Sequence, residues 1–74
     1  MIYYEGVEKL YKKGKKLNTL NKVRDWLVKG GDVWFQKSIF EPAVVFESFD
    51  YSEFSFLGVC EAVINGFVFE AERW

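Results

Sequence analysis

The sequence predicts one small α+β domain over residues 1–74, in which a two- or three-stranded sheet packs on helices. Two stretches with helical periodicity, residues 18–29 and 50–64, predict this class. Each is followed by a stop that contains glycine and then by a short run of strand formers, residues 32–36 and 67–71. With two weaker helical patterns elsewhere, the expected element order is helix–helix–strand–helix–helix–strand.

The first of these helices shows one apolar stripe. Leu20, Val23 and Leu27 recur at i, i+3 and i+7, which is the spacing of one face of an α-helix. Asn18 or Thr19 can accept the unpaired backbone N–H groups of the first turn. Gly30-Gly31 ends the helix, because glycine takes the left-handed cap conformation without a steric penalty.

The two weaker helices are expected over residues 2–13 and 42–48. The first has apolar residues on one side, although Gly6 weakens it by about 1 kcal/mol relative to alanine. Ile2-Tyr3-Tyr4 is alternatively a short strand. Pro42 suits the first position of the second helix, because its missing N–H would be unpaired there in any case.

The late helix carries the sharpest start signal in the chain. Asp50 and Glu53 have the spacing of a capping box, and Phe49 and Phe54 have that of a hydrophobic staple. The segment that follows is apolar around much of its circumference, which predicts burial from more than one side.

A hairpin is the competing interpretation of this region. Asn-Gly between apolar runs is a strong two-residue turn signal, and it would pair residues 59–64 with residues 67–71. Glu61 and Ala62 interrupt the required alternation, so the helix is favoured.

The composition excludes several classes of site. A chain of 74 residues with one cysteine has no intramolecular disulfide, and the absence of histidine removes imidazole catalysis and argues against structural zinc. No cofactor or metal is therefore expected. Carboxylates lie close together in the sequence at residues 41–53, but nothing places them in a cleft, so no enzymatic activity is expected. Eight Phe, four Tyr and three Trp, or a second subunit, would supply the missing stability, so a homo-oligomer with an apparent mass above that of the monomer is also expected.

Charge divides the chain into two halves. Residues 1–29 carry eight basic and three acidic side chains, for a net charge of +5, and residues 30–74 carry two basic and eight acidic, for −6. The acidic half, including Glu41 and Glu47, suits a basic partner, although it also favours solubility. Trp74 would either pack on the core or insert into a neighbouring molecule.

A run of lysines is the other candidate binding segment. Lys12, Lys13, Lys15 and Lys16 could contact phosphates, with Tyr11 stacking on a base, in a nucleic-acid or nucleotide site. A solvated helix end is the simpler interpretation of these lysines.

No apolar run approaches the roughly 20 residues of a membrane span, and no basic-then-apolar leader is visible. The expected location is therefore the cytoplasm.

Residues 17–71 contain a set of features that resembles a family of small, uncharacterised bacteriophage proteins. These features are Leu17-Asn18-Thr19, Trp26-Leu27 followed by Gly30, Val33-Trp34-Phe35, Pro42 and Ile64-Asn65-Gly66-Phe67. The resemblance implies a phage accessory protein in the host cytoplasm that acts by stoichiometric binding of a host protein, for example as an anti-defence or anti-CRISPR inhibitor.

Overall fold

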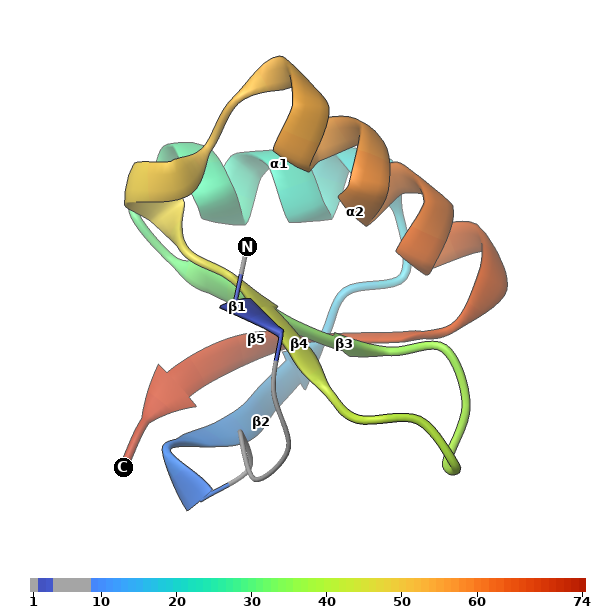
Figure 1. Ribbon diagram of the computed structural model, residues 1–74. Coiled ribbons are helices and arrows are strands. Elements are labelled where there is room, and N and C mark those ends of the chain that lie inside the picture. Colours follow the sequence, from blue (N-terminus) through green and yellow to red (C-terminus); the bar gives the residue numbers. More distant parts are fainter. Residues whose placement is uncertain (1, 4–8) are drawn as a thin grey trace.

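Five antiparallel strands form one sheet, and both α-helices lie against the same face of it (Figure 1). The computed structural model describes residues 2–3 and 9–74. The strand order is β1-β4-β3-β5-β2, and the bounds are β1 Ile2–Tyr3, β2 Tyr11–Lys16, β3 Asp32–Gln36, β4 Val44–Phe46 and β5 Phe67–Arg73. The helices are α1 Leu20–Val28 and α2 Glu53–Asn65, with a short 3₁₀ turn, η2, at Ser48–Asp50. The predicted α+β class is confirmed, with more strands than expected.

Helix α1 and strand β3 follow the sequence-based expectation. The Thr19 hydroxyl accepts a hydrogen bond from the backbone N–H of Lys22 at 3.3 Å, so Thr19 is the N-cap. Gly30 adopts a positive φ of 95°, which gives the helix the left-handed stop that glycine permits. Strand β3 then lies between β4 and β5 in the middle of the sheet.

Two expected helices are absent at the described positions. Residues 11–16 form β2, which pairs with the C-terminal half of β5, and Ile2–Tyr3 form the short strand that was the alternative; residues 4–8 lie outside the described residues. The segment after Pro42 contains β4, because Val44 and Phe46 are buried on one face of the sheet and Val45 on the other. A run that is apolar on both sides lacks the alternation that marks a strand in a sequence.

Helix α2 is confirmed and ends at the expected stop, but its start and the role of its terminal glycine differ from the expected ones. It begins at Glu53, and Ser52 rather than Asp50 is the N-cap, its hydroxyl accepting from the N–H of Ser55 at 3.2 Å. Asp50 lies in η2 instead. Gly66 has extended backbone angles, and a Cβ there would lie only 2.5 Å from the carbonyl oxygen of Gln36. This glycine therefore permits a close approach between α2 and β3 rather than a left-handed cap.

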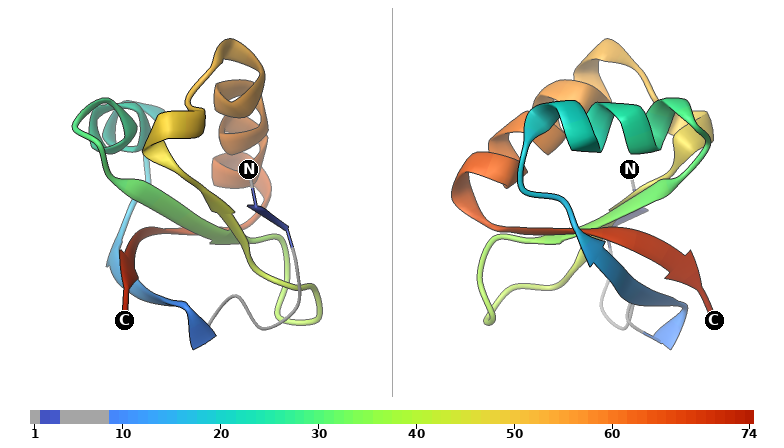
Figure 2. Two further views of the ribbon diagram at one scale, coloured as in Figure 1. Left: turned by 60° about the vertical axis from the view of Figure 1, so that its left-hand side comes forward. Right: turned by 180° about the vertical axis from the view of Figure 1, so that it is seen from behind.

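The sheet separates two apolar clusters. The larger cluster lies between the sheet and the helices, and Figure 2 shows both helices above this one face. It contains fully buried valines from each layer: Val23 of α1, Val33 of β3 and Val59 of α2. The smaller cluster lies on the opposite face and contains Tyr11, Trp34, Ala43, Val45 and Ala71. The central strands are thus buried on both faces.

Candidate functional site

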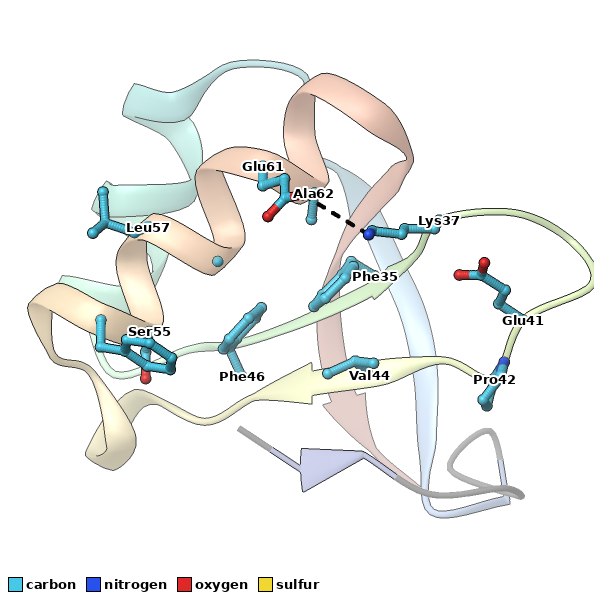
Figure 3. Close-up of a pocket in the computed structure, with 12 residues that line it drawn as sticks. Phe35, Lys37, Glu41, Pro42, Val44, Phe46, Ser55, Leu57, Glu61 and Ala62 are labelled. Carbon is cyan, nitrogen blue, oxygen red and sulfur yellow. Dashed lines mark ion pairs between the residues drawn. The ribbon is translucent and has the colours of Figure 1, made fainter.

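A cavity lies between α2 and the β3–β4 hairpin (Figure 3). Its floor is apolar and includes Phe35 and Phe46, whose rings stack with centroids 5.0 Å apart and an interplanar angle of 11°. Gly58 of α2 lies directly above this pair, since a Cβ at that position would be 3.3 Å from the tip of the Phe46 ring. The volume of about 540 Å³ falls within the roughly 300–1,000 Å³ range of ligand-binding pockets. We call this cavity the α2 groove.

The rim of the α2 groove is charged. Lys37 at the end of β3 reaches across to Glu61 of α2, with Nζ and Oε1 3.8 Å apart (Figure 3). Both side chains are at least half exposed, so solvent screens this pair and it contributes at most about 1 kcal/mol. Glu41 lies on the hairpin side of the rim and is exposed. Of the candidate residues named from the sequence, it is the one that lines this cavity.

The outer face of α2 continues the apolar surface of the groove into solvent. Phe54, Leu57 and Ile64 are 82%, 60% and 75% exposed, and they recur at i, i+3 and i+10 along one side of the helix. In the hairpin that forms the other wall, Ile39 and Phe40 are 74% and 90% exposed. The expectation that α2 is buried from more than one side is therefore wrong for this stripe. Exposure of this kind marks interaction surfaces in folded proteins.

The four candidate lysines lie on β2, an outer strand of the sheet, and their contacts differ. Lys12 pairs with Glu72, with Nζ and Oε2 3.2 Å apart. Lys13 places its Nζ 4.4 Å from the ring centre of Trp34 and 5.2 Å from that of Phe69, so it covers the smaller apolar cluster. Lys15 lines a shallow hollow beside α1, and Lys16 pairs with Phe69 in the strand register. Lys15 and Lys16 are both exposed.

Glu47 lies inside the protein. It is 4% exposed, and its Oε1 accepts a hydrogen bond from the Tyr11 hydroxyl at 3.0 Å. The same hydroxyl accepts from the Arg73 guanidinium at 2.8 Å. Burial, and next the hydrogen bond and charge of Glu47, raise the pKa of Tyr11 above 10.0, although Arg73 opposes this shift. Glu47 therefore joins β2, β4 and β5 instead of facing a partner.

Trp74 follows the end of β5 and is 74% exposed. Its backbone N–H donates to the carbonyl oxygen of Leu10 at 3.2 Å, and Lys12 Nζ lies 5.6 Å from the centre of its ring. The described part of the chain contains no group of three or more side chains suited to hold a metal ion. None of its helices is long and apolar enough to span a bilayer.

Comparisons of the chain with protein-family models, with curated proteins and with solved structures find no match. The class that the coordinates define is a small α+β domain with two helices on one face of an antiparallel sheet and a groove beside the second helix. Most of the groove could not be predicted from the sequence, because every apolar residue of α2 would also suit a buried core. Helical periodicity shows which residues share a stripe, but not which stripe remains uncovered.

Proposed function

We propose that this chain is a non-enzymatic binding protein that holds a partner protein in the α2 groove and on the outer stripe of α2. In the setting that the phage resemblance suggests, the partner is a host protein, the encounter takes place in the host cytoplasm, and binding inhibits the partner. The observation that carries the proposal is the exposure of Phe54, Leu57 and Ile64 next to a cavity with an aromatic floor.

Energetics supports this surface as a binding site. Burying a large apolar side chain that is otherwise exposed contributes about 1.5–3 kcal/mol. A few such side chains at the centre of an interface commonly supply most of its affinity, with aromatic anchors prominent among them. Phe54 is an exposed aromatic side chain that lines the groove from α2. Phe40, which is also exposed, lies in the hairpin loop next to the groove residue Glu41.

Backbone amide mapping by NMR would test where the protein binds. Peptides selected from a random library against the folded domain should shift amide resonances along α2 and the 37–42 hairpin. Leu57→Ser should weaken their binding at least about tenfold, which corresponds to 1.4 kcal/mol. Val28→Ser is the matched control, because Val28 is an apolar residue of α1 with a similar exposure of 67%, outside the groove. Selected peptides whose binding is equally affected by both substitutions would contradict the proposal.

A second candidate function is binding of single-stranded nucleic acid by β2 and the C-terminus. The observation that favours it is the proximity of Lys12 to the exposed ring of Trp74, because such proteins combine cations with aromatic rings on which bases stack. The ion pair of Lys12 with Glu72 and the packing of Lys13 on aromatic rings reduce the charge available for phosphates.

An oligonucleotide titration at low salt would decide this second function. Substituting Lys12, Lys15 and Lys16 together by alanine should abolish salt-dependent anisotropy changes of a labelled single strand. Lys22, Arg24 and Lys29 of the α1 region, replaced in the same way, provide a control with the same loss of charge. If the wild-type protein shows no binding at low salt, this function is excluded.

A further inference from the structure

We infer that the segment of the partner that occupies the α2 groove is an amphipathic helix whose apolar face is flanked by Lys or Arg. This inference rests on the proposed function and specifies the chemistry of the partner. Two independent features of the groove support it: the spacing of the residues that line it and the sign of its charges.

The residues of α2 that line the groove follow helical spacing. They occur at i, i+1, i+3, i+4, i+7 and i+8: Phe54, Ser55, Leu57, Gly58, Glu61 and Ala62. Such a set covers one face of α2 over slightly more than two turns. A second helix laid along that face meets it with residues at the same spacing, as amphipathic helices do in apolar grooves. Gly58 lets the Phe46 ring pack close to the backbone of α2, because a Cβ there would lie 3.3 Å from the tip of the ring.

The charges beside this surface are mostly negative. Helix α2 contains Glu53 and Glu61 and no basic residue. The hairpin wall, residues 37–42, adds Glu41 and Lys37, and Lys37 already pairs with Glu61. Three carboxylates against one lysine give the surface a net charge of −2. Basic residues beside the apolar face of a partner would complement this charge and speed association.

A second copy of this chain fits the surface less well. In a symmetric dimer through the α2 groove, each surface would face its own copy, so that two net charges of −2 oppose one another. Like charges brought together in this way oppose binding. The apolar residues would suit either a partner helix or a second copy of the chain. The negative charge of the groove surface favours the partner helix with basic flanks.

The test uses two fluorescent peptides of about four helical turns, with leucines at i, i+3, i+4 and i+7. They are identical except that the flanking positions carry lysine in one and glutamate in the other. The intact protein should bind the lysine peptide at least about tenfold more tightly, and the difference should shrink as salt is raised to about 0.5 M. Leu57→Ser should weaken the lysine peptide about tenfold, and Val28→Ser should leave it unchanged.

The double variant Glu41→Gln, Glu61→Gln isolates the charge effect. It should remove most of the preference for the lysine peptide, because both rim carboxylates are then neutral and Lys37 is left unpaired. Circular dichroism of each variant would confirm that both helices remain folded.

Other results would overturn the inference in distinguishable ways. Equal binding of the two peptides, lost in Leu57→Ser, would reject the basic partner and retain the groove as a protein-binding site. A dimer in light scattering that Leu57→Ser dissociates, together with no peptide binding, would assign the surface to a second copy. A monomer that binds neither these peptides nor any selected from the random library would reject the inference and the proposed function together.

Discussion

The hydroxyl of Tyr11 donates a hydrogen bond to Oε1 of Glu47 at 3.0 Å, although the two residues are 36 positions apart. Tyr11 belongs to β2, at one side of the sheet, and Glu47 directly follows β4, near the other. Glu47 is almost completely buried, and this hydrogen bond partly compensates for the desolvation of its carboxylate.

Tyr11→Phe should therefore lower the free energy of unfolding by about 1–3 kcal/mol, because it leaves a buried acceptor without its partner. Urea unfolding followed by circular dichroism measures the change. Tyr51→Phe is the matched control: Tyr51 is 40% exposed, and its ring contact with Phe56 does not need the hydroxyl. If both substitutions had the same small effect, the hydrogen bond would contribute nothing to stability.

The same tyrosine predicts a loss of stability in alkali. Its pKa is raised in the folded protein, first by burial and then by Glu47, so folding favours the neutral form. A group of this kind contributes stability that is complete below its unfolded pKa of 10.0 and is lost as pH rises through its higher folded pKa. The wild-type protein should consequently lose stability more steeply above about pH 10 than Tyr11→Phe does. The urea midpoints of both proteins, measured from about pH 8 to about pH 11, provide the comparison; parallel curves would contradict the prediction.

Local signals were sufficient for about half of the fold. Helix α1, its glycine stop and β3 could be predicted from the sequence, because Thr19 and Gly30 determine the two helix ends within a few residues. The end of α2 and the start of β5 were predicted for a similar reason, although the close approach of Gly66 to β3 was not. A helix or strand can be predicted from the sequence when the residues at its own ends determine where it starts and stops.

Long-range pairing explains the errors. Residues 11–16 form a strand because β5 offers a partner more than fifty residues away, with Tyr11 opposite Arg73. Strand β4 forms between β1 and β3 with both faces buried, and its sequence shows no alternation. Among the candidate binding residues, Glu41 was found on the groove rim and Glu47 in the interior. The charge of a glutamate does not reveal which of these positions it occupies.

Gly31 permits a contact that a larger residue would block. Trp26 of α1 folds over it, and the indole N–H donates to the carbonyl oxygen of Asp32. A Cβ at position 31 would lie inside the space of this ring. Gly31→Ala should therefore displace the indole and lower the free energy of unfolding by about 1–3 kcal/mol, the range for overpacking.

Thermal unfolding and near-ultraviolet circular dichroism would measure the loss of stability and the movement of the indole. Gly30→Asn is the control, because Gly30 has open space around its Cβ position and asparagine tolerates a positive φ. If alanine at position 31 left the near-ultraviolet spectrum unchanged, the close packing of Trp26 on Gly31 would be disproved.

The lysines of β2 lead to a prediction about association. Among the described strands β2 pairs only with β5, so it is an edge strand, and its register shifts between Lys13 and Lys16. Lysines and bulges on edge strands are devices that prevent pairing with another chain. Replacing Lys12, Lys15 and Lys16 by threonine retains strand propensity and removes the positive charges that would repel the same edge of another molecule. Lys13 is left unchanged because it packs over Trp34.

This triple variant should show a larger apparent mass than the wild-type protein in light scattering at high concentration. Threonine at Lys22, Arg24 and Lys29 removes the same charge from the α1 region and should leave the apparent mass unchanged. The comparison separates an effect of net charge, which both variants share, from an effect of the exposed strand edge, which only the β2 variant has. Equal masses for the two variants would mean that the lysines do not protect this edge.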